Sequence, residues 1–244
     1  LSVPMFGTER SERGFCIQKQ RPKGAAKVRI LTAAILAAGT LFAGLPDAAT
    51  PVTNLTFTAF DTETTGFSPK NDRIVEIGAV RFRGDGEILA VTNWLINPGM
   101  PMPFYATQAN GITTEMVSGA PVFSAVWPEF AAFCQDSILL AHNANFDAGF
   151  LRAELTRAGV EPPDLTVGDT LSLFRCWFPQ AKSYALEPLS VYLGVQGGNY
   201  HRAEADSFHI INIFNAGMKL RPDMRFQQLE RDAGGFIRLN GRRN

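Results

Sequence analysis

The chain has 244 residues, is 45% apolar and carries no net formal charge at neutral pH. A chain of this length can bury one sizeable core, so we expect one main domain with flanking segments. Its three cysteines are an odd number without metal-type spacing. They argue against a disulfide scaffold and indicate free thiols in a reducing compartment.

The charge is unevenly distributed along the chain. Residues 1–29 contain seven basic and two acidic residues, and residues 219–244 contain seven and three, which leaves nine basic and eighteen acidic residues in 30–218. An acidic core is unusual for a simple nucleic-acid-binding domain, which bears a basic patch. It suits a domain whose carboxylates collect cations, while the basic ends either touch phosphates or are merely solvated tails.

The first 54 residues precede the regular part of the chain. Residues 1–29 are polar, rich in Gly and Pro and without periodicity, so we expect a disordered segment. Residues 30–45 are uncharged and follow basic residues, as in a signal peptide. However, Pro46-Asp47 stands where a cleavage site is needed, and the run is short for a membrane span. We expect residues 30–54 to form an apolar helix and linker in a cytoplasmic protein; a membrane anchor through residues 30–45 is the alternative.

From residue 55 onward, hydrophobic periodicity predicts a mixture of strands and helices. Strands are expected at residues 55–60, 74–82, 87–96 and 138–141, the second and third forming a hairpin around Gly84-Asp85-Gly86. Helices are expected at residues 113–117, 123–133, 145–157, 169–177, 186–193 and 203–218. This order indicates an α/β or α+β sheet domain. The final segment, residues 219–244, is expected to be a basic C-terminal tail.

The sharpest feature is an Asp-x-Glu pair at the end of the first expected strand. Side chains two residues apart in a strand point the same way, so Asp61 and Glu63 converge at its carboxyl end, where open sheets place their sites. Two close carboxylates repel each other, and a hard cation such as Mg²⁺ or Mn²⁺ relieves that repulsion. The turn that follows offers backbone N–H groups to a phosphate or sugar. Taken alone, an exposed pair of solvated acids is the commoner explanation.

Two further carboxylates follow expected strands or open expected helices. Asp147 stands in the first turn of the helix after the fourth strand, where an acid is favourable for helix stability alone. Asp206 stands in the first turns of the last helix, five residues after His201. A single His near an Asp is usually structural. We expect His142 and Asn143 to be hydrogen-bonded parts of their loop rather than ligands.

Together these segments resemble the three motifs of the DnaQ-like (DEDDh) exonuclease family. The motifs are Asp-x-Glu-Thr-Thr-Gly after a strand, His-Asn-Ala-x-Phe-Asp after a later strand, and His-x4-Asp near the C-terminus. The segments 72–80, 97–99, 111–113 and 169–171 also resemble the family in the expected order. A tyrosine would stand four residues before Asp206 in the sister subclass, whereas this chain has His201 five before it. The family includes the proofreading subunit of bacterial DNA polymerase III, ribonuclease T and oligoribonuclease.

The resemblance implies a ribonuclease H-like α/β fold, with a five-stranded mixed sheet and helices on both faces, over an exonuclease domain at residues 55–218. It implies that two divalent cations, Mg²⁺ or Mn²⁺, are held by four acids: Asp61, Glu63, Asp147 and Asp206. His201 would act as the base that takes a proton from the attacking water, because neutral imidazole is available near pH 7. The product would be a nucleoside 5′-monophosphate.

The same resemblance implies a set of substrate contacts: Glu63, Thr64, Thr65, Gly66, Asn110 and Phe146. Glu63 would touch the terminal 3′-hydroxyl, which explains an end-directed polarity. The family often carries a histidine where this chain has Asn110, which leaves the substrate preference open. Phe104, Tyr105 and Phe146 are candidates to stack on bases, although core packing is the commoner role of such residues.

We therefore expect a two-metal-ion 3′–5′ exonuclease that acts on single-stranded DNA, in proofreading or repair. An exoribonuclease that trims RNA or oligoribonucleotides is the alternative, because the distinction depends on contacts to the 2′-hydroxyl. A catalytically silent nucleic-acid-binding module is a further alternative, which the complete set of acids and histidine argues against. A DNA polymerase is a possible partner, although residues 219–244 contain no clear polymerase-binding motif. A membrane partner is not expected.

Overall fold

The computed structural model describes residues 45–195 and 202–241. The disordered segment expected at residues 1–29 and all but Leu45 of the apolar helix expected at residues 30–45 lie outside the described residues. Within the described part of the chain, no helix has the length and apolar character needed to cross a membrane.

Each strand and helix that periodicity predicts from residue 55 onward is present. The strands are β1 (Thr56–Thr64), β2 (Ile74–Arg83), β3 (Ile88–Leu95), β4 (Ile138–Ala141), β5 (Thr166–Asp169) and β6 (Phe236–Arg238). The helices are the short 3-10 turn η1 (Val52–Asn54), α1 (Phe104–Asn110), α2 (Thr114–Ser118), α3 (Phe123–Phe133), α4 (Ala144–Arg157), α5 (Thr170–Trp177), α6 (Leu186–Leu193), α7 (Ala203–Lys219) and α8 (Phe226–Asp232). Periodicity alone did not predict α1, α8, β5 and β6.

The strands form one mixed sheet in the order β3-β2-β1-β4-β5-β6. β2 is antiparallel to β1 and β3. β4 pairs parallel with β1 on one side and with β5 on the other. The α/β fold with a mixed sheet is therefore confirmed. The sheet differs from the expected five strands by the addition of β6, which pairs antiparallel with β5.

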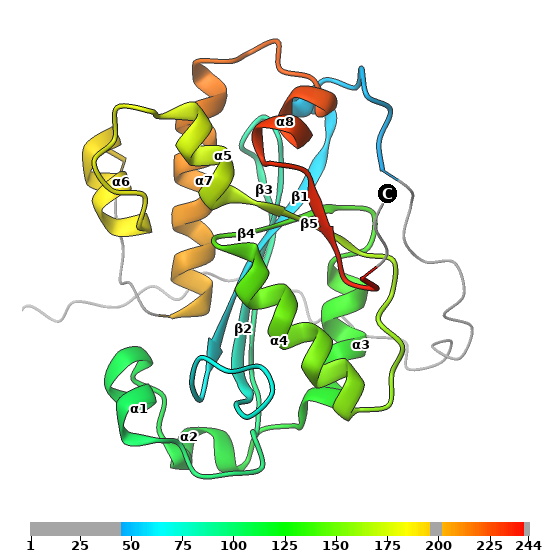
Figure 1. Ribbon diagram of the computed structural model, residues 1–244, viewed down its shortest axis with the longest axis vertical. Helices are drawn as coiled ribbons and strands as arrows, with labels where there is room; N and C mark the ends of the chain where they lie inside the picture. Colours follow the sequence, from blue (N-terminus) through cyan, green and yellow to red (C-terminus); the bar gives the residue numbers. More distant parts are fainter. Residues whose placement is uncertain (1–44, 196–201, 242–244) are drawn as a thin grey trace, which may run out of the picture. The chain divides into compact units, whose positions relative to one another are not determined.

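Helices cover both faces of the sheet, with α7 on one side and α3 and α4 on the other (Figure 1). The core beneath α5, α6, α7 and α8 contains Phe57, Ala59 and Phe82 from the sheet. The core beneath α3 and α4 contains Phe60 and Leu139. Because side chains alternate along a strand, the odd-numbered residues of β1 face α7 and the even-numbered ones face α4.

Helices α1 and α2 lie beyond the carboxyl end of β1 (Figure 1). Together with β2 and the adjoining loops they bury a small separate cluster: Val75, Met102, Ala106, Ile112 and Val117. Helix α1 was missed because it directly follows a run rich in Pro and Gly, residue types that are typical of loops. Pro103 is in fact its N-cap, and the left-handed Gly111 ends it after seven residues.

The segment expected to be a basic C-terminal tail is folded in large part. Helix α8 buries Phe226 and Leu229 in the core, and β6 extends the sheet. Arg152 of α4 donates hydrogen bonds to the carbonyl oxygens of Arg238 (3.0 Å) and Leu239 (3.1 Å). The basic residues concealed these elements, because the few apolar side chains between them span too short a length to show a period.

Candidate active site

Strand β1 delivers two carboxylates to the face of the sheet that α7 covers. Asp61 and Glu63 share the parity of Phe57 and Ala59, which pack in the core beneath α7. The intervening Thr62 points to the opposite face. Because β1 extends to residue 64, both acids lie inside the strand, where pairing with β2 fixes their backbone.

Helix α7 brings Asp206 to the same place because its first turn lies directly against β2. Gly78 makes this approach possible, since a Cβ there would lie 2.1 Å from the backbone nitrogen of Glu204. The buried Ser207 hydroxyl lies 3.1 Å from the Gly78 carbonyl oxygen. Gly78 is also the cross-strand partner of Asp61. The start of α7 is thus held beside the strand that carries the other two acids.

The three acids form a cluster of oxygen donors. Carboxylate oxygens of Asp61, Glu63 and Asp206 lie within 4.8 Å of one another, and each residue is half-buried. Oxygen donors at this spacing suit a hard divalent cation such as Mg²⁺ or Mn²⁺. The structure therefore brings together three of the four acids that the sequence predicts at a metal site.

Asp147, the fourth predicted acid, approaches from the other face of the sheet. It stands in the first turn of α4 and is 2% exposed. Its Oδ1 accepts hydrogen bonds from the backbone N–H (3.1 Å) and the hydroxyl (2.7 Å) of Thr62. Asp147 is not one of the three acids whose oxygens lie within 4.8 Å of one another. It is nevertheless tied to the strand residue between Asp61 and Glu63.

The acids oppose one another's ionisation. Burial raises the pKa of Asp61 well above its usual value, and the charges of Asp147 and Glu63 raise this pKa further. Burial also raises the pKa of Asp147 to about 7, although the hydrogen bonds from Thr62 oppose that change. Positive charge placed among these groups would favour their ionised forms. The electrostatics of the cluster therefore suit a cation.

His201, the predicted base, lies outside the described residues. The next residue, Arg202, is the N-cap of α7, and its guanidinium forms an ion pair with the fully buried Glu76. Sequence reasoning gave neither residue a role. The available signal was the charge of Glu76 within the otherwise apolar run 74–80 of β2, since a buried acid requires a partner.

The turn at residues 64–66 is held by hydrogen bonds between Thr65 and Arg73. Thr65 is fully buried. Its N–H donates to the Arg73 carbonyl oxygen (2.9 Å), and its hydroxyl oxygen accepts from the Arg73 N–H (3.0 Å). The expectation that this N–H approaches a phosphate is therefore wrong for Thr65. Gly66 lies so near Asp72 that a Cβ would meet its carboxyl group at 2.6 Å.

Asn110 joins α1 to this turn and is only 4% exposed. Its Oδ1 accepts from the Ile112 N–H (3.0 Å), and its Nδ2 contacts the Thr64 carbonyl oxygen (3.5 Å). The sequence predicted a substrate-facing side chain here. The structure instead uses the amide to hold α1 at the carboxyl end of β1.

The candidate stacking residues divide into packed and exposed rings. Phe146 is half-buried and packs on Phe150, with ring centroids 4.8 Å apart. Phe104 and Tyr105, for which core packing was the commoner expectation, are 79% and 56% exposed. Phe67, which sequence reasoning overlooked, is 85% exposed directly after the closed turn. Large exposed rings of this kind suit contact with bases.

The loop that contains His142 and Asn143 is hydrogen-bonded, as expected. The ring nitrogens of His142 contact the Thr170 hydroxyl (3.1 Å) and a backbone carbonyl oxygen (2.8 Å). The Asp169 carboxylate accepts hydrogen bonds from the N–H groups of Asn143 (3.0 Å) and Leu171 (3.2 Å). One acid thereby caps the beginnings of both α4 and α5.

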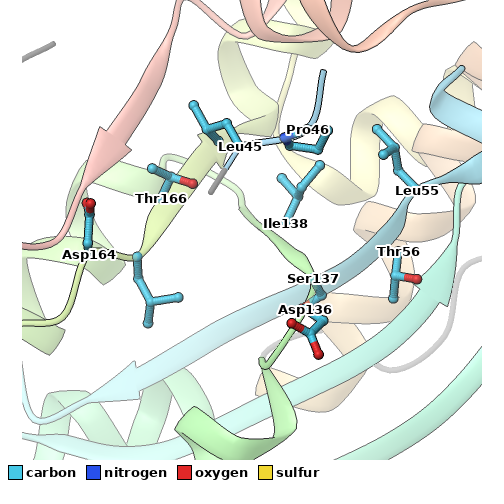
Figure 2. A pocket seen from close by; sticks show the side chains of 10 residues that line it. Leu45, Pro46, Leu55, Thr56, Asp136, Ser137, Ile138, Asp164 and Thr166 are labelled. Atoms are coloured by element: carbon cyan, nitrogen blue, oxygen red, sulfur yellow. The ribbon is translucent and has the colours of Figure 1, made fainter. Parts of the chain in front are cut away.

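A pocket of about 110 Å³ lies at the amino ends of the strands, opposite the acidic cluster (Figure 2). Leu45, Pro46 and Ile138 contribute apolar walls, and Thr56 and Thr166 stand at the amino ends of their strands. The acidic cluster stands at the carboxyl end of β1. The pocket is therefore not part of the acidic site.

Comparison with known protein families identifies this arrangement. The family model RNase_T, described as "Exonuclease", matches residues 58–214. The chain belongs to this exonuclease family. The expected resemblance to DnaQ-like exonucleases is thereby confirmed, and the chain is an enzyme of a phosphodiester-hydrolysing family.

Two of the curated relatives are named as DNA polymerase III proteins. DNA polymerase III subunit epsilon of Treponema pallidum is 39% identical over 163 residues, which are 66% of this chain and 75% of that protein. DNA polymerase III PolC-type of Clostridium perfringens is 40% identical over 163 residues, which are 67% of this chain and 11% of that protein. The chain thus spans only a small part of its PolC-type relatives.

Solved structures show the same fold. Exonuclease X in complex with 5′ overhanging duplex DNA has a TM-score of 0.60 and 24% identity, covering 73% of this chain and 99% of that one. E. coli Exonuclease I in complex with a dA16 oligonucleotide has a TM-score of 0.63 and 21% identity, covering 69% and 42%. These likenesses confirm the mixed sheet with helices on both faces.

Proposed function

We propose that this chain is a metal-dependent 3′–5′ exonuclease that removes nucleoside 5′-monophosphates from DNA in proofreading or repair. The observation that carries the proposal is the meeting of Asp61, Glu63 and Asp206 from β1 and α7 within 4.8 Å. Burial, together with the charges of Asp147, Glu63 and Asp206, raises the pKa of Asp61 well above its usual value, so the fold brings these acids together at an energetic cost. Such an arrangement is typical of a site where charge is needed for chemistry.

The donor set fits two divalent cations, Mg²⁺ or Mn²⁺. Asp61, Glu63 and Asp206 would hold one cation, and Asp61 together with Asp147 would hold the second, directly or through water. When bound, such cations stabilise the charge that develops on the attacking and leaving oxygens of an in-line displacement at phosphorus.

The chain's own residues would carry the remaining steps. His201 would accept the proton from the attacking water, as a neutral imidazole does near pH 7. Glu63 would bind the terminal 3′-hydroxyl and so restrict cleavage to the chain end. The exposed rings of Phe67, Phe104 and Tyr105 would stack on the bases next to that end.

DNA is the favoured substrate because the named relatives belong to DNA polymerases and the similar structures are described with DNA. A DNA polymerase is the partner that these relatives suggest. The free cysteines Cys134 and Cys176 fit a reducing, cytoplasmic compartment.

A digestion assay tests the proposal. DNA and RNA oligonucleotides labelled at either end would be incubated with the protein and Mg²⁺, Mn²⁺ or EDTA. We expect stepwise shortening of single-stranded DNA from the 3′ end, only with a divalent cation, and no activity in Asp61→Ala. Asp164→Ala, which removes an exposed acid on the far edge of the sheet, is the matched control.

Three outcomes would contradict this function. Faster shortening of RNA than of DNA would make the chain an exoribonuclease. Binding without cleavage in either cation would make it a non-catalytic nucleic-acid-binding module. Full activity of Asp61→Ala would place the catalytic site elsewhere.

A further inference from the structure

Thr62 places a buried hydroxyl between the two acids of β1. It is 5% exposed and lies on the α4 face of the sheet, where Phe60, two residues earlier, packs in an apolar core. A valine occupies nearly the same space as a threonine, so packing alone does not call for a hydroxyl here. A buried hydroxyl is also costly unless it is hydrogen-bonded. The contacts of Thr62 should therefore show what the hydroxyl does.

Both donors of Thr62 are directed at a single atom, Oδ1 of Asp147. The hydroxyl oxygen lies 2.7 Å from Oδ1, and the backbone nitrogen lies 3.1 Å from it. The hydroxyl donates in this contact, because an ionised carboxylate only accepts hydrogen bonds. One residue of the strand thereby holds one oxygen of the helix residue at two points.

This contact decides which oxygen of Asp147 serves as a ligand atom. A carboxylate oxygen has two lone pairs, and the two donors of Thr62 occupy those of Oδ1. Oδ2 is therefore the oxygen that remains for a cation. Rotation of the carboxyl group would exchange the two oxygens only by breaking both hydrogen bonds.

Asp147 acts on the acidic cluster although it approaches from the other face of the sheet. Burial is the main reason that the pKa of Asp61 is raised, and the charge of Asp147 raises it further, ahead of the charge of Glu63. Asp147 nevertheless stands apart from the three acids whose oxygens lie within 4.8 Å of one another. An acid at the margin of the cluster has to be held in place if it is to share a cation with Asp61.

We propose that Thr62 is a positioning residue, which holds Oδ1 of Asp147 and so reserves Oδ2 for the cation shared with Asp61. This inference rests on the proposed function, in which Asp147 helps to hold the second cation. Thr62 would act through Asp147 alone. Hydrogen-bonding partners of metal-binding groups typically contribute about 10- to 100-fold to metal affinity or activity.

The test compares Thr62→Val, which removes the hydroxyl, with Thr62→Ser, which keeps it. We expect kcat of Thr62→Val on single-stranded DNA to fall about 10- to 100-fold, with KM at the wild-type value because Thr62 is buried. Thr62→Ser should keep a kcat close to that of the wild type. A residue that only filled space would show the reverse order, because valine preserves the volume of the side chain and serine does not.

Cation binding without substrate gives a second readout. Titration calorimetry of Thr62→Val with Mn²⁺ should show the weaker of the two dissociation constants raised about 10- to 100-fold. The tighter one should stay unchanged, because Asp61, Glu63 and Asp206 keep their places. Thr62→Ser should bind Mn²⁺ like the wild type.

Thr58→Val is the matched control. Thr58 lies on the same strand and the same face, is fully buried, and its hydroxyl oxygen lies 2.6 Å from that of Ser137. Ser137 donates its own hydrogen to the Cys134 carbonyl oxygen (2.7 Å), so Thr58 is the donor to Ser137. Thr58→Val thus also removes a buried hydroxyl donor from β1, and its kcat and Mn²⁺ binding should equal those of the wild type.

Thermal melting in EDTA shows whether the variants fold. If Thr62→Val does not, Thr62→Ala takes its place, because it also lacks the hydroxyl and needs no additional space. The same loss of kcat and of Mn²⁺ affinity is expected, and wild-type values would overturn the inference.

Three further outcomes overturn the inference. Wild-type kcat in Thr62→Val would show that the hydroxyl is not needed to position Asp147. An equal loss in Thr58→Val would assign the effect to β1 as a whole. A Thr62→Ser variant as slow as Thr62→Val would show that the hydroxyl does not carry the effect.

Asp147→Ala separates this inference from the proposed function. Full activity of Asp147→Ala would overturn both the second cation site and the role of Thr62. An inactive Asp147→Ala beside a fully active Thr62→Val would overturn the role of Thr62 and leave the proposed function intact.

Discussion

The carboxylate of Asp147 crosses from α4 to accept two hydrogen bonds from Thr62, the residue between the two acids of β1. It does so although burial raises its pKa from 3.8 to about 7. A raised carboxyl pKa means that the folded state holds the proton more tightly than the unfolded state. The protonated Asp147 carboxyl therefore contributes its full share of the free energy of unfolding below about pH 4. This contribution is lost as the pH rises through about 7.

Asp147→Asn should therefore stabilise the metal-free protein at pH 8 while abolishing exonuclease activity. The amide oxygen can still accept both hydrogen bonds from Thr62, and the cost of the buried charge disappears. We expect a gain on the order of 2 kcal/mol in the free energy of unfolding. Urea denaturation in EDTA at pH 5 and pH 8 measures it.

The comparison between the two pH values is decisive. The wild type should lose more stability than Asp147→Asn between pH 5 and pH 8. Asp164→Asn, at an exposed acid, should follow the wild type. Parallel curves for wild type and Asp147→Asn would contradict the raised pKa.

Cation binding should release protons. Asp61 and Asp147 both have raised pKa values in the metal-free protein, and a cation binds only their ionised forms. The apparent affinity for Mn²⁺ should therefore increase from pH 6 to pH 8. Titration calorimetry in two buffers of different ionisation enthalpy measures the released protons directly, and equal heats in both buffers would argue against the linkage.

Gly78→Ala should impair both folding and catalysis. The added Cβ would overlap the backbone at the start of α7, 2.1 Å from the nitrogen of Glu204. Overpacking of this kind costs about 1–3 kcal/mol, and the displaced helix would carry Asp206 away from its partners. Thermal melting and the Mn²⁺ dissociation constant are the measurements.

Gly119→Ala is the control for this substitution. Gly119 ends α2 in a right-handed conformation, and a Cβ there would meet nothing within 4 Å. It should melt and bind Mn²⁺ like the wild type. If Gly78→Ala does the same, the close approach of α7 to β2 is not needed for the site.

The sequence predicted those parts of the fold that local patterns determine. The alternation in β1 placed Asp61 and Glu63 on one face, and the periodicity of α4 and α7 placed Asp147 and Asp206 in their first turns. The ion pair between Glu76 and Arg202 joins residues 126 positions apart, and no local pattern reports such a distance. Strand β6 was hidden for the same reason, because three residues become a strand only through pairing with β5.

Asp169 should prove more important for stability than its place outside the catalytic cluster suggests. Its carboxylate accepts hydrogen bonds from backbone N–H groups at the starts of two helices, α4 and α5. Loss of two helix caps costs about 2 kcal/mol, so Asp169→Ala should lower the urea midpoint accordingly. Asp164→Ala removes an exposed ion pair with Arg238, which is worth at most about 1 kcal/mol. Equal losses in the two variants would contradict the double cap.

Three consecutive residues of β1 face both helical layers: Asp61 and Glu63 face α7, and Thr62 faces α4. A shift of the strand by one residue would exchange these faces completely. Asp61 and Glu63 would then lie beneath α4, and Thr62 would meet Asp206. The strand should therefore tolerate no single-residue insertion or deletion. Length variation among active relatives should be confined to the loops that flank it.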